Sequence, residues 1–499
     1  MDTGVITKLR HISEYIDNIK KTAYLDIENI ENLALSKNPN SDLVKKYTSE
    51  LKSNELTKIF IVKQIIVFYL KNILRFILYS IEYIIFKIFG KKSEVDWSQK
   101  NFLIDVFFLV DNIIKDNNFK ENYFGGLYDV LERHNKNYIF LPRLYGVSKN
   151  PFKLITLFNV TNQDKSNVFV YEYELLNIVD IFKIFNFIVK YPFKQFRLIQ
   201  NNKHELDVYF NYELFNVLSG TSFIAYVRYL VGKKVVKKIA DGSKIISWQE
   251  FHNIEKSFNK AIKESSKDIV IYGCEFSMTY EAYIGMHITD VDSDLKVTPH
   301  QTLLNGRRNY SNSIKHVFKC GVSLRYQNLF RYKDSGKAGK KPLALIGYDI
   351  GEGVDILKKA KSLDKLDVKI HPATSESQFD KYMKGGWDYV YGDLYKALKG
   401  ADMVFTPPYA GTSLEAVACG VPVIIMANED NLINPLVDYG KGRIWDVAFN
   451  EQDAEKCRNN LLQYKDNNPG EIEKIASWYK ENFFVEPTEE NIVRVFELN

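Results

Sequence analysis

The sequence lacks the features that mark several large classes of protein. It has four cysteines in 499 residues and no CxxC pair, which excludes zinc ribbons and a dense disulfide framework and is typical of a reducing compartment. No GxxxxGK[ST] phosphate-binding loop is present. The net charge is only +5, far from the strongly basic balance of a dedicated nucleic-acid binder. The first residues are polar and contain no apolar signal core. We therefore expect a cytoplasmic globular protein of two or three domains.

One long apolar stretch, residues 59–90, could contact a membrane. Five charged residues interrupt it: Lys63, Lys71, Arg75, Glu82 and Lys87. No uncharged run reaches the roughly 18–20 residues needed to span a bilayer. On a helical wheel Lys71, Asn72, Arg75 and Glu82 fall on one side, with apolar residues over the rest. Two interpretations stay open: a helix in a membrane interface with its cations towards anionic headgroups, or a helix packed against the rest of the protein.

From about residue 100, short apolar runs alternate with helical patterns. Strands are predicted at 102–110, 138–144 and 268–273, and then at 342–348, 366–371, 401–406 and 421–426. Such alternation predicts an α/β fold with parallel sheets and helices on both faces. The polar, Gly- and Lys-rich segment 331–342 is interpreted as a linker between two α/β domains. The aromatic-rich middle, 150–265, gives no topology that can be traced from sequence.

Two segments that follow predicted strands of the second α/β domain carry candidate binding residues. Ligands of open parallel sheets bind beyond the carboxyl ends of the strands, and His371-Pro372 lies at such an end. In the segment 406–420, TPPYAGTSLEAVACG, Gly411 frees the turn, and Thr412 and Ser413 stand in the first turn of a helix. Helix N-termini offer unpaired N–H groups to phosphate, although the same residues also make plain N-caps.

The segment 401–426, ADMVFTPPYAGTSLEAVACGVPVIIM, resembles the nucleotide-sugar half of GT-B glycosyltransferases. Residues 387–405 resemble the preceding unit of that fold. The His-Pro pair about forty residues before a Ser/Thr pair is similar to the bacterial sialyltransferases, polysialyltransferases and Kdo transferases, whose donors are CMP-sugars. The resemblance implies two Rossmann-like domains facing a cleft. The expected division is a helical extension over 1–98, an acceptor domain over 99–335 and a nucleotide-sugar domain over 336–499.

The resemblance also implies roles for single residues of the second α/β domain. His371 with Pro372, and Thr412 or Ser413 beside Gly411, would hold the donor phosphate. Glu415 would bind the ribose, and Tyr391-Gly392 the edge of the base. No metal or other cofactor is expected, because a protonated His371 and a helix N-terminus would stabilise the charge that grows on the phosphate.

The general base that an inverting transferase needs is expected in the first α/β domain. Related CMP-sugar transferases carry an acidic-acidic-Gly motif there. This chain has Asp241-Gly242, but Ala240 stands where a second acid is expected. Glu275, just past the strand at 268–273, is a second candidate, and His300 is expected near the cleft at the next strand end. The segment DVDSD, 290–294, is interpreted as a solvated turn.

Together these features predict a membrane-associated glycosyltransferase on the inner face of the cytoplasmic membrane. It would transfer a nonulosonic acid or Kdo from a CMP-activated donor to a surface glycan or lipid-linked acceptor, without binding nucleic acid. Three alternatives stay open: a UDP-sugar 2-epimerase, a CDP-alditol phosphotransferase and a non-catalytic nucleotide-binding scaffold.

Overall fold

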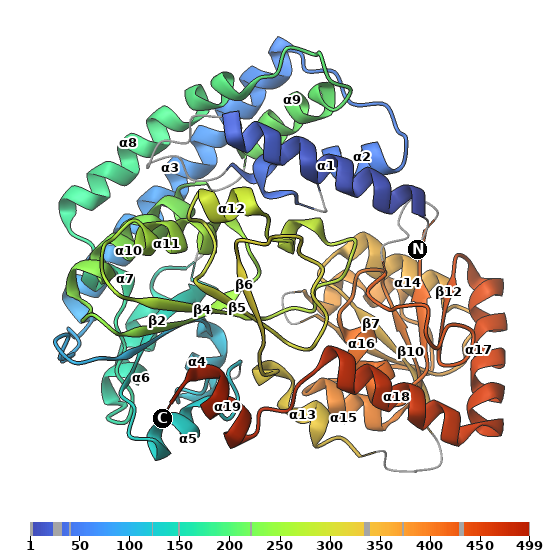
Figure 1. Cartoon of the computed structure of the whole chain (residues 1–499). Helices are drawn as coiled ribbons and strands as arrows, with labels where there is room; N and C mark the ends of the chain where they lie inside the picture. Colours follow the sequence, from blue (N-terminus) through green and yellow to red (C-terminus); the bar gives the residue numbers. More distant parts are fainter. Residues whose placement is uncertain are drawn as a thin grey trace.

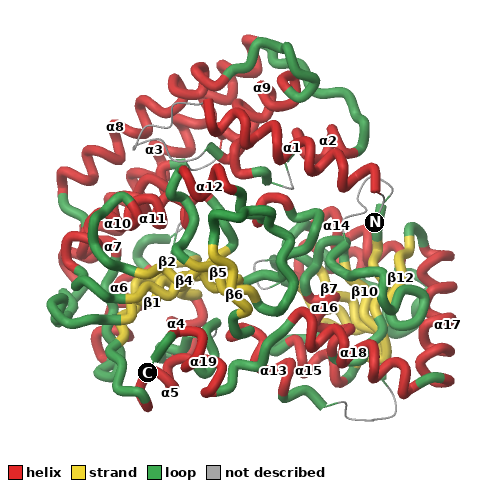
Figure 2. Tube along the Cα trace, in the orientation of Figure 1, coloured by secondary structure: helices red, strands yellow, loops and turns green. Residues whose placement is uncertain are grey.

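The computed structural model describes the chain except for residues 1, 2, 23–31, 39–40, 122, 148–149, 220–221, 334–339, 372–373, 429–433 and 499. The described residues form two six-stranded parallel sheets, one in each half of the chain, beneath a layer of N-terminal helices (Figures 1 and 2). Each sheet is flanked by helices, so the predicted α/β class with two Rossmann-like domains is confirmed.

The first sheet has the strand order β2-β1-β3-β4-β5-β6, and every neighbouring pair is parallel. Its strands are β1 Phe102–Leu109, β2 Tyr138–Tyr145, β3 Lys244–Gln249, β4 Val270–Glu275, β5 Gln301–Leu304 and β6 Val317–Cys320. Most side chains of β1, β3 and β4 are buried, as expected for strands covered on both faces.

Helices surround this sheet and form the N-terminal layer. The N-terminal helices are α1 Thr3–Thr22, α2 Asp42–Thr48 and α3 Lys58–Phe89. Those that follow β1 and β2 are α4 Val110–Asp116, α5 Leu127–Arg133, α6 Lys153–Gln163, α7 Glu172–Leu175, α8 Ile178–Gln195, α9 Asp207–Asn216 and α10 Phe223–Lys238. Those that follow β3, β4 and β6 are α11 Asn253–Lys263, α12 Asp290–Asp294 and α13 Gln327–Phe330.

The second sheet has the order β12-β11-β10-β7-β8-β9 and is also parallel. Its strands are β7 Lys341–Ile346, β8 Leu366–Ile370, β9 Trp387–Tyr389, β10 Ala401–Thr406, β11 Val423–Met426 and β12 Trp445–Ala448. The remaining helices are α14 Ile350–Lys359, α15 Leu394–Lys399, α16 Thr412–Ala418, α17 Glu451–Asn467, α18 Pro469–Phe483 and α19 Glu489–Phe496.

The chain returns to the first domain at its end. After α18, the last helix, α19, lies beside α5 below the first sheet (Figure 1). Glu489 at its start pairs with Arg133 at 2.6 Å and with His134 at 3.3 Å. The expected domain boundary at 335/336 falls among residues 334–339, which lie outside the described residues.

The long helix α3 differs from the predicted arrangement of its polar residues. Asn72 and Glu82 are fully buried and face the protein: Asn72 accepts a hydrogen bond from the Ser222 amide at 3.1 Å, and Glu82 pairs with Arg75 at 2.6 Å. Burial forces these groups to find protein partners. The polar residues on one side of the helical wheel therefore hold α3 against the rest of the protein. Among them, Lys71 is the exposed residue. Among the described residues, no helix is apolar over a length that could cross a membrane.

The segment 290–294 also differs from its prediction as a solvated turn. It forms the short helix α12, in which Asp292 is fully buried. Its carboxylate pairs with Lys20 of α1 at 2.8 Å, and both side chains are closed to solvent. The sequence gives no sign of this partner because it lies 272 residues away.

Candidate functional site

The topology of each sheet marks one place where a ligand crevice is expected. In the first sheet β2 lies on one side of β1 and β3 on the other, so the connections diverge between β1 and β3. In the second sheet they diverge between β7 and β10. Ligands of open parallel sheets bind at the carboxyl ends of such diverging strands. These ends lead into Glu250 and His252 after β3, and into Tyr348 and Thr406 at β7 and β10.

Loops from the carboxyl edges of the two sheets meet. A Cβ placed on Gly411, after β10, would lie 3.8 Å from the Cβ of Met278, after β4. Met278 is buried among apolar residues of the second domain.

Arg325, in the short 3₁₀-helix Leu324–Tyr326 that follows β6, interacts electrostatically with Glu250 on its own domain and with Glu415 and His371 on the other. The guanidinium carbon lies 4.1 Å over the ring of Phe276. Arg325 is thus a solvent-exposed cation at the junction of both domains.

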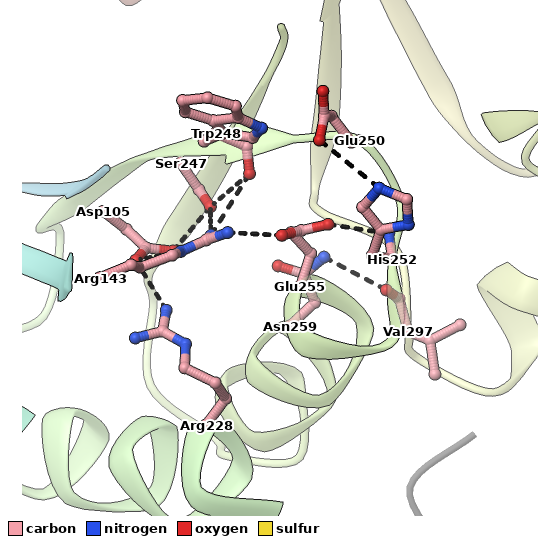
Figure 3. A network of polar contacts seen from close by, with 10 residues as sticks. All are labelled: Asp105, Arg143, Arg228, Ser247, Trp248, Glu250, His252, Glu255, Asn259 and Val297. Atoms are coloured by element: carbon pink, nitrogen blue, oxygen red, sulfur yellow. Dashed lines mark hydrogen bonds and ion pairs between the residues drawn. The ribbon is translucent and has the colours of Figure 1, made fainter. Parts of the chain in front are cut away.

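A carboxylate–imidazole pair follows β3 at this junction. Glu250 Oε2 lies 3.5 Å from His252 Nε2 (Figure 3). The Ser277 hydroxyl donates to the other Glu250 oxygen. Burial raises the pKa of Glu250, but the hydrogen bonds from His252 and Ser277 outweigh burial and hold it below its usual value. Burial lowers the pKa of His252, but Glu250 and Glu255 outweigh it and raise that pKa overall. Half of the His252 side chain is open to solvent, so it can take or give a proton.

A buried ionic network lies beneath this pair (Figure 3). Asp105 on β1 accepts hydrogen bonds from Arg143 on β2, at 2.8 Å, and from Arg228 on α10, at 2.6 Å. Arg143 also pairs with Glu255 at 2.5 Å. In turn, Glu255 accepts the backbone N–H of His252 at 2.8 Å, which fixes the start of α11. Through Glu255 and Arg143, the network therefore connects the backbone of His252 to Asp105 on the central strand β1.

Glu275, the candidate base at the end of β4, lies on the neighbouring strand. It is opposite Gln249 in the register, so it lies beside the loop that holds Glu250. Its carboxylate accepts the backbone N–H of Asn305 at 2.8 Å and the Thr279 hydroxyl. Burial raises its pKa against these hydrogen bonds. Both Glu275 oxygens thus have partners within the first domain, whereas half of the His252 side chain is open to solvent.

His371 follows β8 on the facing edge and is exposed. Its ring meets that of Tyr348 edge-on, with centroids 6.3 Å apart. Desolvation and the positive charge of Arg325 lower the pKa of His371. The protonated His371 expected from the sequence is therefore disfavoured in the free protein, and Arg325 supplies the nearby positive charge. Pro372 lies outside the described residues.

The candidate side chains at the start of α16 are half-buried or buried. Thr412 is half-buried at the first position of the helix, after Gly411. Ser413 is fully buried and donates its hydroxyl to the Ala410 carbonyl at 2.7 Å, so it makes a turn contact rather than facing solvent. Glu415 is 6% exposed and accepts the hydroxyl of Tyr395. Burial raises the pKa of Glu415, opposed by Arg325 and Tyr395.

Tyr391 and Gly392 lie in the loop after β9, at the same edge as His371. Tyr391 is largely exposed, and Gly392 has a φ of +89° with open space where a Cβ would stand. Lys369 of β8 holds this loop by donating to the Gly392 carbonyl at 2.5 Å. An open loop with a glycine at positive φ allows a flat ligand to approach the backbone.

Asp241 and His300 lie elsewhere. Asp241 precedes β3 and accepts the Asp268 amide at 3.2 Å, at the amino edge of the sheet. His300 precedes β5 instead of following a strand, and its Nδ1 accepts the Ile271 amide at 3.1 Å. Burial and Lys263 lower the pKa of His300 to about 4. In a parallel sheet the amino edge faces away from the carboxyl ends, so the structure does not bring either residue to His371.

Sequence reasoning missed Glu250, His252 and Arg325. The signal for the first two is the segment KIISWQ, 244–249, an apolar strand followed by EFHNIE. Recognising β3 would have placed the histidine after a strand end. Arg325 has no such signal. Among the described residues, no three His, Cys, Asp or Glu side chains lie close enough to hold a metal ion.

Known proteins offer only remote similarity. No model of a known protein family matches the chain, and no curated protein matches it either. Among solved structures, the chain is similar to a UDP-N-acetylglucosamine 2-epimerase, with a TM-score of 0.43 and 10% identity over 80% of this chain and 95% of that one. It is also similar to the glycosyltransferase SnogD from Streptomyces nogalater, with a TM-score of 0.39 and 9% identity over 80% of this chain and 99% of that one. A third similar structure is MurG from Acinetobacter baumannii, with a TM-score of 0.39 and 10% identity over 80% of this chain and 100% of that one. Scores this low carry no functional argument.

Proposed function

We propose that this protein is a glycosyltransferase that moves a sugar from a CMP-activated donor, a nonulosonic acid or Kdo, to a surface glycan or lipid-linked acceptor at the inner face of the cytoplasmic membrane. One observation carries the proposal. An acid–base pair, Glu250 and His252, and a cation beside a histidine, Arg325 and His371, occupy the junction of two carboxyl sheet edges. Sugar transfer from a nucleotide needs both: a proton acceptor for the incoming hydroxyl and positive charge for the leaving phosphate.

The donor would lie on the second domain. Arg325, His371 and the Thr412 hydroxyl would contact the phosphate, whose negative charge grows as the bond to the sugar breaks. Groups fixed where that charge develops stabilise the transition state more than the ground state. Glu415, held by Tyr395, would accept ribose hydroxyls, and the open Tyr391–Gly392 loop would approach the base. No step in this scheme requires a metal.

The acceptor would be activated from the first domain. His252, oriented by Glu250, would take the proton of the acceptor hydroxyl as that oxygen forms its bond to the anomeric carbon. The bond from that carbon to the phosphate oxygen breaks, and CMP leaves with the electron pair. Such a single displacement inverts the anomeric centre. Glu275, on the next strand, is the alternative base, and the variants His252→Ala and Glu275→Gln separate the two.

A thermal-shift panel tests the proposal first. Purified protein would be heated with CMP, CDP, UDP, GDP and TMP, and the panel repeated with His371→Ala and Arg325→Ala. Ligand at about 100 times its dissociation constant adds about 2.7 kcal/mol of stability. We expect CMP to stabilise the wild type and the control variant His134→Ala, whose altered side chain follows α5 and pairs with Glu489 of α19. We expect no stabilisation by CMP in His371→Ala or Arg325→Ala.

Other outcomes would redirect the proposal. Stabilisation by UDP without CMP would overturn the donor and favour the 2-epimerase, which conversion of UDP-N-acetylglucosamine without acceptor would reveal. A response to CDP alone would favour the alditol phosphotransferase. Binding of CMP with no release of CMP from CMP-sugars on any glycan acceptor would favour a nucleotide-binding scaffold.

A further inference from the structure

Two neighbouring helices expose matched apolar stripes. On α3, side chains spaced three or four apart point outwards: Ile59, Val62, Ile66, Leu70, Ile73 and Ile77. On α8 the same spacing brings out Ile178, Phe182, Phe185, Val189 and Phe193. Leu70 is 68% exposed and Phe182 69%. Spacing of three and four places each set on one face of its helix, and both helices already bury a second apolar stripe against the protein.

The two stripes lie side by side. α3 and α8 run antiparallel at the outside of the molecule (Figure 1). Phe76 meets Phe185 at 5.5 Å between ring centroids, and Phe68 meets Tyr191 at 5.7 Å. The Tyr69 hydroxyl donates to the Val189 carbonyl at 2.8 Å. The contacts fix the register, so the exposed stripes form one surface along the 18 residues of α8, a length of about 27 Å. We name it the α3–α8 face.

The charges of this face have one sign. Both helices are described throughout, and along them every exposed charged side chain is a lysine, including Lys63, Lys71, Lys183 and Lys190. Their two acids, Glu82 and Asp180, are buried and engaged in ion pairs with Arg75 and Lys234. An apolar surface this large is unusual on a monomeric soluble protein. Lysines flanking it match an anionic bilayer, where apolar side chains enter the acyl boundary and cations meet headgroups.

We infer that the α3–α8 face is a bilayer-binding surface for anionic phospholipid, on which both helices lie parallel to the membrane plane. The inference extends the proposed function, since it names the lipid partner and adds α8, which no sequence pattern singled out. Its test does not depend on sugar transfer.

The test is flotation of the full chain with vesicles. We would use equal parts phosphatidylcholine and phosphatidylglycerol, and phosphatidylcholine alone for comparison. The wild type should float with the anionic vesicles. Leu70→Glu/Phe182→Glu should lower binding roughly tenfold or more, because two charges then enter the apolar layer. Lys71→Gln/Lys183→Gln should weaken it on the order of 25-fold, about fivefold for each lysine. The control Ile314→Glu changes an apolar residue that is 90% exposed outside this face, and should bind like the wild type.

Three results would overturn the inference. They are wild-type protein that stays with the soluble fraction, equal binding by Leu70→Glu/Phe182→Glu, and a stable dimer in sedimentation that Leu70→Glu converts to monomer. The last would assign the face to a second copy of the chain. The altered side chains are exposed, so the variants should melt like the wild type. CMP-induced stabilisation in the absence of lipid should also be unchanged in them. Loss of vesicle binding with retained nucleotide binding therefore separates this inference from the proposed function.

Discussion

Desolvation and the guanidinium of Arg325, which belongs to the first domain, lower the pKa of His371 in the second domain. Both effects act in the same direction, so the imidazole is mainly neutral in the free protein at neutral pH. A bound phosphate would reverse this balance, because its negative charge favours the imidazolium. The relationship across the domains therefore predicts a measurable proton uptake when nucleotide binds.

Calorimetry at pH 7 in buffers of different ionisation enthalpy would measure that uptake. We expect uptake of up to one proton per CMP in the wild type, and affinity that falls as pH rises through the raised pKa of His371 in the complex. In His371→Asn the uptake should vanish. Uptake that persists in this variant, or no uptake in the wild type, would show that His371 does not meet the phosphate.

The Glu250–His252 pair predicts a pH profile. A histidine base acts in its neutral form, so kcat/KM should rise with pH through the raised pKa of His252. In Glu250→Gln the carboxylate no longer raises that pKa, and burial lowers it, so the acidic limb should move to lower pH. The rate plateau should also fall, because the imidazole loses its orienting partner. His252→Ala should lower kcat by about 10²–10⁴-fold. An unmoved acidic limb in Glu250→Gln would transfer the role of base to Glu275.

The buried network beneath the site predicts a large loss of stability. Asp105→Asn leaves Arg143 and Arg228 without their shared carboxylate and should cost about 3–5 kcal/mol in urea unfolding. Burial raises the pKa of Asp105, but Arg143 and Arg228 outweigh it and lower the pKa to about 2. Its contribution is therefore present above the usual Asp pKa and lost as pH falls towards about 2. The control Asp111→Asn breaks only the exposed pair with Lys153. A change in Asp105→Asn no larger than in this control would contradict the prediction.

Strands with strong apolar patterns could be predicted from the sequence, and those interrupted by polar residues could not. The runs FLIDVFFL and ADMVFT are buried and coincide with β1 and β10. β3 was missed because Lys244, Ser247 and Gln249 break the run KIISWQ, although Ser247 and Gln249 are buried in the sheet. Ser247 is accommodated because it donates to Asp105 at 2.9 Å, a contact 142 residues away. Such long-range partners are invisible to local patterns.

The residues of the candidate site could be predicted from the sequence only where they follow a strand that could be predicted. His371 and Thr412 follow strands that the sequence predicts, so their positions at the carboxyl edge were expected. His252 depends on the missed β3, and Arg325 lies after β6, a strand that has no buried residue. The sequence predicts the wrong end of the strand for His300, because the pattern TPHQTLL does not show where β5 begins.

The buried pair of Lys20 and Asp292 predicts how α1 is held to the first domain. Lys20→Met leaves Asp292 charged and closed to solvent, and should cost about 3–5 kcal/mol in urea unfolding. In Lys20→Met/Asp292→Asn the buried charge is gone, while the amide oxygen can still accept the Thr289 amide that Asp292 holds at 3.0 Å. The double variant should therefore be more stable than Lys20→Met. Burial raises the pKa of Asp292, but Lys20 and two further lysines hold it far below its usual range, so the wild-type advantage should shrink as pH falls below the usual Asp pKa.

The exposed pair of Lys8 and Glu50 serves as the control, since Glu50→Gln should leave the midpoint nearly unchanged. If Lys20→Met and the double variant unfold at the same urea concentration, the two side chains are not coupled, and α1 is held by its apolar contacts alone.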